Sequence, residues 1–410
     1  MGFMYDALKI FAIFTLIVLL IKRKMNLGLS MMIGAGGLAL LYLLPLSAIG
    51  NTLISAITNY TTIQMMAALG LIMVMENIMR KTDTFKQMME SLKRVVRDTR
   101  IVLAAPPAII GMVPSIGGAY FSAPLVEEAG SAISISPERK GFINYWFRHI
   151  WEYVLPTYPG LILASAITHV PLGKLILYQT PFAVMVVVSG GIFCFRGIDL
   201  NRKGPSPSGV DTLRTRKGRD LARLTASMFP ILSIILMVAL FHMDIAIVMA
   251  VVISFMFIYH RFPLRKIAMT LRESISWNIL LIIVGVMFFK ETLRATGAVD
   301  GMSLFLTQTG FPLMILFFIL PFLVGLLTGL TIAFVGTAFP LLITLSGGAP
   351  ETGKMAFAFA SGFMGVMFSP MHLCFVLTGE YFSADRGTIY RYMLIPSGMV
   401  MLTAVAMWMV

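Results

Sequence analysis

The segment from residue 101 to residue 130 reads IVLAAPPAIIGMVPSIGGAYFSAPLVEEAG. It is apolar enough to enter a bilayer, yet it carries the helix-breaking residues Pro106-Pro107, Pro114, Gly117-Gly118 and Pro124. A straight helix does not accommodate prolines at this density, because each removes a backbone hydrogen bond and clashes with the preceding turn. Irregular backbone at membrane depth is tolerated only where protein covers it or water reaches it. We therefore expect a re-entrant hairpin over residues 101–129.

A second broken apolar segment follows at residues 311–345, and the helix breakers of the two halves match in order. Three pairs have one and the same separation along the chain, namely Pro107 with Pro321, Gly111 with Gly325 and Pro156 with Pro370. Pro181 and Pro396 match to within a single position of that separation. These matches in register indicate an internal duplication. Paired Gly/Pro-interrupted segments in two halves point to a transporter binding site.

The composition supports an integral membrane protein. Hydrophobic residues make up 58% of the 410 residues and charged residues only 12%, against about 25% charged residues in soluble domains. Apolar stretches long enough to cross a bilayer recur along the whole chain. The net charge of +13 lies in short loops between them, which is typical of topology signals and not of nucleic-acid binding. The two cysteines, Cys194 and Cys374, show no metal-binding or disulfide spacing, so we expect no metal site and no cofactor.

The predicted fold is an all-α integral membrane protein with two inverted repeats. Each repeat has five transmembrane spans, one re-entrant hairpin and one discontinuous helix. The first repeat covers residues 1–196 and the second covers 224–410, with a basic cytoplasmic linker at 197–223. The expected spans are 5–21, 27–49, 63–79, the broken span 142–169 and 175–195, followed by 224–241, 245–259, 277–293, the broken span 355–378 and 389–409. Residues 82–100 suit an interfacial helix because they are charged and amphipathic.

An odd number of spans per repeat inverts the second repeat relative to the first. One choice of cytoplasmic loops holds 27 of the 32 Lys and Arg residues. These loops are 22–24, 80–100, 137–148, 196–223, 260–272 and 386–391. By the positive-inside rule, this predicts a multi-pass protein of the inner (plasma) membrane with both termini outside.

The hairpin tips are candidate solute-binding segments. Glycines let the backbone approach a ligand, and the free N–H groups at half-helix starts attract anions. The candidates are Ser115, Gly117, Gly118 and Ser122 in the first hairpin, and Thr328, Thr331 and Thr337 in the second. The alternative is a packing seam of small residues between helices.

Ionisable residues mark the broken spans. Arg148 would be the counter-charge for an anion, and Glu152, about ten residues or roughly 15 Å into its span, would be the coupling-ion or proton site. His149 could shuttle protons, and His372, beside Pro370 at the second break, could face the same cavity and bind the solute. The alternative for Arg148 and Glu152 is a structural pair on one helix face. The alternative for His372 is a packing residue.

Two further classes of protein stay open. A cation/proton antiporter would exchange ions without an organic solute. Glu127 and Glu128, with His149 and His169 downstream, could activate water in an intramembrane hydrolase. The chain lacks an HExxH motif, and a position at the cytoplasmic mouth of the hairpin explains both glutamates, so we expect no enzymatic activity.

Residues 111–130 (GMVPSIGGAYFSAPLVEEAG) and 144–159 (NYWFRHIWEYVLPTYP) resemble an uncharacterised membrane family within the ion transporter superfamily. That superfamily includes dicarboxylate and citrate carriers, gluconate permeases and the large membrane subunits of TRAP systems. The resemblance spans nearly the whole chain and implies an elevator-type carrier, often a homodimer, whose hairpins and discontinuous helices form the site. The Ser-Asn-Thr tips of the dicarboxylate branch are absent, and Ser115 and Thr331 stand in their place.

Together these features predict a secondary active transporter in the lipid bilayer, working by alternating access. Its partner would be a small anionic solute such as an organic acid, and transport would be coupled to H⁺ or Na⁺.

Overall fold

The computed structural model describes residues 2–84, 87–88, 90–91, 98–112, 118–198, 217–241, 243–297, 312–347 and 351–409. Throughout these ranges the regular structure is helical, and no strand occurs in them. The predicted all-α class is therefore confirmed for the described residues.

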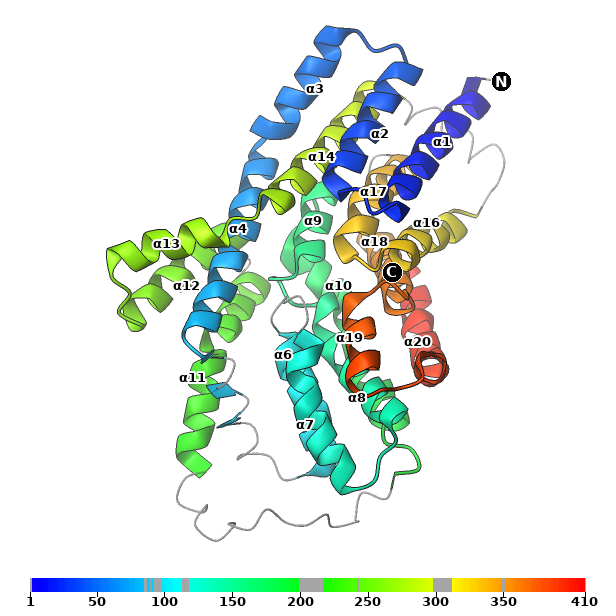
Figure 1. Cartoon of the computed structure of the whole chain (residues 1–410). Helices are drawn as coiled ribbons and strands as arrows, with labels where there is room; N and C mark the ends of the chain where they lie inside the picture. The colour runs from blue at the N-terminus through cyan, green and yellow to red at the C-terminus, as the bar shows by residue number, and fades with distance from the viewer. Residues whose placement is uncertain are drawn as a thin grey trace.

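The described helices of the first half run in chain order through Figure 1 from blue to green. They are α1 (Gly2–Lys22), α2 (Leu27–Leu41), α3 (Leu46–Thr58), α4 (Tyr60–Lys81), α6 (Thr99–Gly111), α7 (Gly118–Ala132), α8 (Pro137–Arg148), the short 3₁₀ helix η1 (Ile150–Tyr153), α9 (Pro159–Thr168) and α10 (Leu172–Phe193).

The second half contains a matching series. It consists of α11 (Lys217–Ile235) with its π-helical end η3 (Leu236–Leu240), α12 (Ile245–Tyr259), α13 (Leu264–Ser274), α14 (Trp277–Ala295), α16 (Leu313–Thr328), α17 (Thr331–Leu345), α18 (Thr352–Met367), α19 (Leu373–Tyr381) and α20 (Arg386–Trp408).

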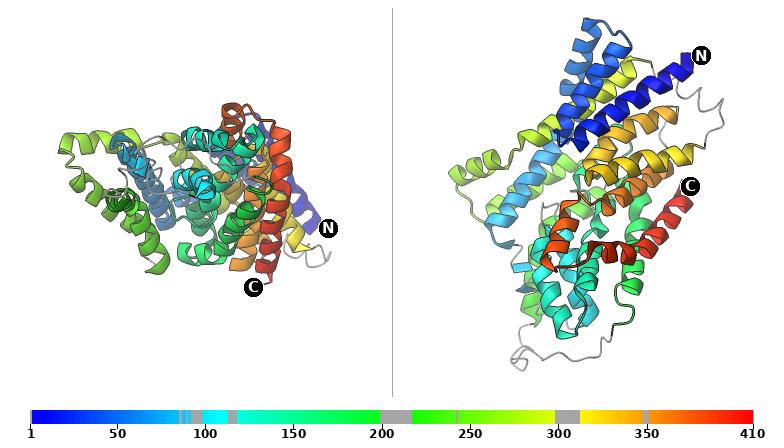
Figure 2. Two further views of the ribbon diagram at one scale, coloured as in Figure 1. Left: turned by 90° about the horizontal axis from the view of Figure 1, so that it is seen from below. Right: turned by 45° about the vertical axis from the view of Figure 1, so that its right-hand side comes forward.

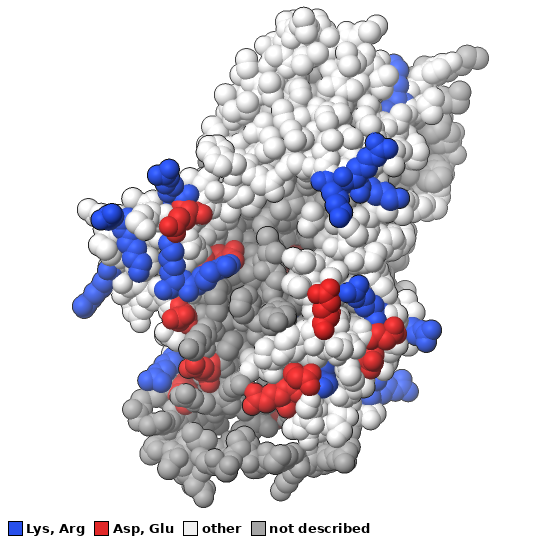
Figure 3. Space-filling view, in the orientation of Figure 1, with Lys and Arg blue, Asp and Glu red and all other residues white. Residues whose placement is uncertain are grey.

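Several helices are suited to a membrane. Among the described residues, four are long and apolar enough to cross a bilayer: α4, α10, residues 220–238 of α11 and η3, and α20. The α13–α14 pair would be a fifth span, bent by 50° at its break. In Figure 3 the surface over α2 and α3 is almost free of charged side chains, and Leu40, Leu46 and Ile54 are exposed there. Such a surface suits contact with lipid, and the chain is therefore a membrane protein.

The structure differs from the predicted spans in two places. The span expected over 27–49 ends as a helix at Leu41, because Pro45 cannot continue it and instead precedes the first residue of α3. Residues 264–274, expected within a loop, form the helix α13, with apolar residues on one side and basic residues on the other. The expected interfacial helix at 82–100 lies largely outside the described residues.

The helices form two packed groups. One group has α14 against α2 and α3, and α4 against α12 and α13. The other contains α6 to α10 and α16 to α20, with α16 packed on α18 and α10 on α20. Figures 1 and 2 show α11 to α13 on one flank of the molecule and α20 on the opposite flank. The broken helices lie in the second group.

The α2–α14 crossing gives a direct test of this packing. A Cβ on Gly28 would overlap the backbone of Leu281 and Ile282, and a Cβ on Gly285 would overlap the carbonyl of Gly28. We expect Gly28→Ala to lower the free energy of unfolding by about 1–3 kcal/mol, the usual cost of overpacking. Gly36→Ala in the same helix meets open space and should be neutral or stabilising by up to about 1 kcal/mol. Thermal unfolding in detergent compares the two variants, and equal midpoints would contradict this helix contact.

Candidate functional site

Both broken spans unwind near the centre of the second helix group. The first stops at Arg148, passes through His149 and η1, and resumes at Pro159 as α9. The second stops at Met367 and resumes at Leu373 as α19. Pro159 starts its helix because its fixed φ suits the first helical position, where no N–H is needed. Pro370 also has no N–H donor, and the backbone around it therefore belongs to neither flanking helix.

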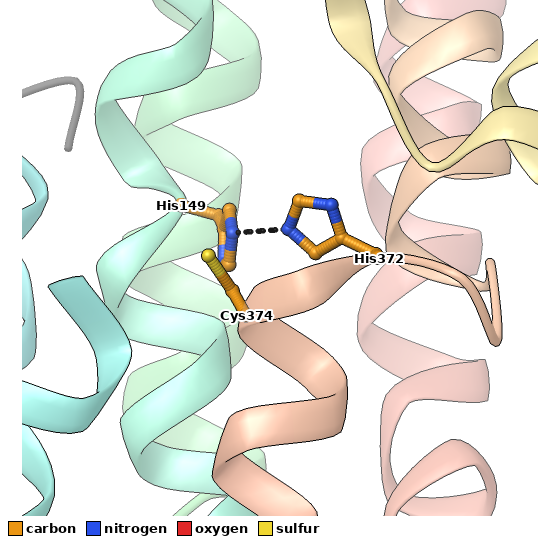
Figure 4. Close-up of side chains that lie close together, drawn as sticks. All are labelled: His149, His372 and Cys374. Carbon is orange, nitrogen blue, oxygen red and sulfur yellow. Dashed lines mark hydrogen bonds between the residues drawn. The ribbon is translucent and has the colours of Figure 1, made fainter. Parts of the chain in front are cut away.

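The histidine at the first break contacts the histidine at the second break. The Nε2 atoms of His149 and His372 are 3.1 Å apart, as Figure 4 shows. Cys374, in the first turn of α19, lies beside them, and its Sγ and the histidine nitrogens all lie within 4.8 Å of one another. The ring of Tyr145 packs against both imidazoles. The two halves of the chain thus contribute chemistry to one buried cluster.

The second hairpin tip touches both breaks. Gly329 ends α16 in the left-handed region with φ +66°, which turns the chain sharply into α17. Its carbonyl accepts a hydrogen bond from His372 Nδ1 at 2.8 Å. Two residues on, Thr331 Oγ1 donates to Glu152 Oε2 at 3.4 Å and its methyl group lies against Gly160. The tip is therefore held between His372 of one break and Glu152 of the other.

The first hairpin is fixed to the first break from its α6 side. The carbonyl of Ala108 accepts from Trp151 Nε1 at 2.6 Å, and the carbonyl of Gly111 accepts from the Tyr158 hydroxyl at 2.5 Å. Gly111 has no side chain because a Cβ would overlap the carbonyl of Arg148. These contacts tie the end of α6 to η1 and to the residues on either side of it.

A polar chain crosses the core beside the site. Ser122 Oγ donates to Asn144 Oδ1 at 2.6 Å, and Asn144 Nδ2 donates to Thr378 Oγ1 at 3.3 Å. All three residues are fully buried. Sequence reasoning proposed Ser122 for the solute but did not select Asn144 or Thr378. The available signal was an amide inside an apolar broken span, where polar groups must find partners.

Ionisable residues proposed from the sequence lie together at the first break. Arg148, His149 and Glu152 are all buried at the first break, with exposed fractions of 3%, 1% and 7%. Because α8 ends at Arg148, Glu152 lies on the 3₁₀ helix, and Arg148 and Glu152 do not share one α-helical face.

The proposed hairpin residues are less closely connected to the breaks. Thr328 and Thr337 donate to the carbonyls of Val324 and Ala333 in their own helices. Gly118 begins α7, whereas Ser115 and Gly117 lie outside the described residues.

A cavity of about 320 Å³ lies between α4, α9, α10 and the start of α12. Its lining includes the polar side chains of Gln64, Ser165, His169 and Asp244. It borders the C-terminal end of α9, whose N-terminal end lies at Gly160 beside Thr331. The helix α9 therefore runs from the cavity to the crossing of the two breaks.

Fold and site together define an α-helical membrane protein whose core is built from interrupted helices and hairpins. The chain belongs to the family described as "Protein of unknown function (DUF401)", which matches residues 7–410. Among curated proteins no match is found.

A solved structure shares the fold. It is described as "Crystal structure of the Alcanivorax borkumensis YdaH transporter reveals an unusual topology". The match has a TM-score of 0.56 at 15% sequence identity, and covers 89% of this chain and 88% of the other. At this identity the likeness concerns the fold alone, and the similar protein is a transporter.

Proposed function

We propose that this protein is a secondary active transporter of a small organic anion across the inner membrane, coupled to H⁺ or Na⁺. The observation that carries the proposal is the meeting of three helix starts at the two breaks. Gly160 of α9 lies against Thr331 of α17, and Gly329 beside Thr331 lies against His372, which precedes α19. Helix N-termini present free N–H groups and a partial positive charge, so their convergence favours an anionic ligand. Arg148 would add a full positive charge.

The matching helix order of the two halves supports alternating access by two inverted repeats. The helices from α1 to α10 correspond in order to those from α11 to α20, and the starts of matching helices keep a nearly constant separation along the chain. Contacts correspond as well, because α6 packs on α8 as α16 packs on α18, and α9 packs on α17 as α19 packs on α7. In this proposal each repeat has five spans and a re-entrant hairpin, and both termini face outside.

A pair of side-chain contacts supports the same symmetry. Asn26, which caps α2, bonds to Asn278 near the start of α14. Asp244, which caps α12, bonds to Gln64 near the start of α4. Gln64 lies in the second turn of α4 and Asn278 in the first turn of α14, so both contacts are made near the start of a matched helix. Both contacts lie within the first helix group. They would make this group a rigid frame, against which the second group could move.

Glu127 supports a transporter over a hydrolase. Its carboxylate is paired with Lys140 Nζ at 2.7 Å and accepts from Ser131 at 2.6 Å. A carboxylate committed to an ion pair is a weak base for activating water. Glu152, in contrast, lies beside the proposed solute position and would bind the coupling ion.

The proposal is tested with purified protein and a panel of small carboxylates, sugar acids and inorganic oxyanions, each in Na⁺ and K⁺ buffers at two pH values. We expect one anion class to raise the melting temperature, since a ligand at a hundred times its Kd stabilises the folded state by about 2.7 kcal/mol. The same anion should enter proteoliposomes against its gradient only when an ion gradient is imposed.

The control variant is Arg148→Gln, which should abolish the anion response and keep any response to Na⁺ or pH. A response to Na⁺ or pH alone in the native protein, with ion exchange in proteoliposomes and no organic solute, would show the cation/proton antiporter and contradict the anion proposal.

A further inference from the structure

The His149–His372 contact has no proton donor between its two facing nitrogen atoms, for the following reason. His149 Nδ1 lies 2.6 Å from the carbonyl oxygen of Tyr145, and His372 Nδ1 lies 2.8 Å from that of Gly329. A carbonyl oxygen only accepts, so both Nδ1 atoms must carry the proton. In neutral imidazoles the two Nε2 atoms are then both acceptors, and they face each other at 3.1 Å. Two lone pairs at this distance require a positive species between them.

We propose that this species is a soft or borderline transition-metal ion, Cu⁺ or Zn²⁺, bound by His149 Nε2, His372 Nε2 and Cys374 Sγ (Figure 4). Two imidazole nitrogens on one tetrahedral ion with bonds of about 2.05 Å lie about 3.3 Å apart, close to the 3.1 Å of this pair. The thiolate sulfur should lie about 3.6 Å from each nitrogen, and the three ligand atoms lie within 4.8 Å of one another.

The surroundings of the cluster are those of a metal site. Histidines that bind metals donate their second ring N–H to a carbonyl, a carboxylate or water, which fixes the ring and its tautomer. Both histidines here donate to backbone carbonyls, that of Tyr145 in the last turn of α8 and that of Gly329 at the end of α16. Cys374 is the second residue of α19, where the positive end of the helix favours the thiolate that binds metals. The donor set N₂S is one that thiolate-binding ions prefer over Mg²⁺ or Ca²⁺.

The charge of the three ligands and the access to the cluster are also consistent with a bound metal ion. A thiolate with two neutral imidazoles neutralises Cu⁺ and leaves one net positive charge with Zn²⁺, so either ion reduces the cost of burying the cysteine as an anion. His149 and Cys374 are buried, with exposed fractions of 1% and 6%, whereas His372 is half-buried and next to the exposed Met371. An ion could therefore approach from the side of His372.

The test is metal binding by the full-length protein in detergent, after chelator treatment and removal of any affinity tag. Zn²⁺, and Cu⁺ under anaerobic conditions, are titrated against a chromophoric competitor. We expect about one ion per chain, and a Kd at least roughly tenfold weaker in His149→Ala, His372→Ala and Cys374→Ser, since even changes to the outer shell cost 10–100-fold. The matched control is Cys194→Ser, which removes the other buried thiol and should bind as the native protein does.

Co²⁺ substitution in the native protein keeps the test independent of folding in the variants. A thiolate-to-metal charge-transfer band together with intense visible bands would show a near-tetrahedral site with Cys374 as a ligand. Absence of binding by both ions would overturn the proposal and leave a shared proton between the histidines. Binding that persists unchanged in Cys374→Ser, or that is lost in Cys194→Ser, would overturn it as well. None of these outcomes depends on the transported solute, so the site and the proposed function fail separately.

Discussion

Glu152→Gln is expected to leave the protein folded and to remove the dependence of uptake on the driving ion. The carboxylate lies at the crossing of the two breaks, accepts a hydrogen bond from Thr331 at 3.4 Å and is 7% exposed. Glutamine keeps the shape and an acceptor oxygen, but its neutral amide can neither bind a proton nor balance the charge of Na⁺. An interaction with a charged group is worth about 1.5–3 kcal/mol, and losing a contact of that size between the carboxylate and the driving ion corresponds to roughly a 10–150-fold loss of coupled uptake.

The measurement is uptake of the anion into proteoliposomes with and without imposed pH and Na⁺ gradients. The control is Glu351→Gln, since the Glu351 side chain is 66% exposed and pairs with Lys354 at the surface. That variant should retain both rate and ion dependence. Unchanged ion dependence in Glu152→Gln would remove the coupling role from this residue.

Gly329→Ala is expected to disable the second hairpin tip. Gly329 has φ +66°, and a Cβ there would come within 3.0 Å of the backbone of Met371 and His372. The left-handed conformation alone costs an L-residue about 1–2 kcal/mol, and the overlap with the backbone of the second break adds about 1–3 kcal/mol of overpacking. We expect loss of the anion-dependent stabilisation together with a clear drop in melting temperature.

Gly347→Ala separates the two costs. Gly347 follows α17 with φ +76°, and no atom of the described residues lies within 4 Å of its Cβ position. This variant should lose only the conformational part, about 1–2 kcal/mol, and keep the response to the anion. If both variants unfold at the same temperature and respond alike, the close contact between the hairpin tip and the second break is contradicted.

The sequence was sufficient for most of the helical elements because bilayer thickness and helix breakers leave few choices. The prediction for residues 245–259 coincides with α12, and the break expected at Pro370 lies between α18 and α19. The helix of 27–49 was predicted too long because a single Pro45 in an apolar run was given too little weight. The helix α13 was missed because a short amphipathic segment with many basic residues resembles a loop in composition.

The site was predictable only in part, because it depends on contacts between distant residues. Glu152, His149 and His372 are unusual inside apolar spans, and that alone marked them. The matched breaks suggested that His149 and His372, from opposite halves of the chain, face one cavity, but their direct contact required the tertiary structure. Cys374 looked like an apolar core residue, since its role depends on the position of α19 beside α8. Thr331 was chosen as a hairpin residue, but its bond to Glu152 required the tertiary structure.

The burial of both cysteines has a practical consequence for topology. Cys194 and Cys374 are the only thiols in the chain, and both are shielded from solvent. A cysteine placed at an exposed position, such as Arg23 between α1 and α2 or Asp385 before α20, would therefore be the one thiol open to a bulky, membrane-impermeant maleimide. The native chain already serves as the low-background parent for labelling in intact cells, and single additions to it can report which side of the membrane each connecting segment faces.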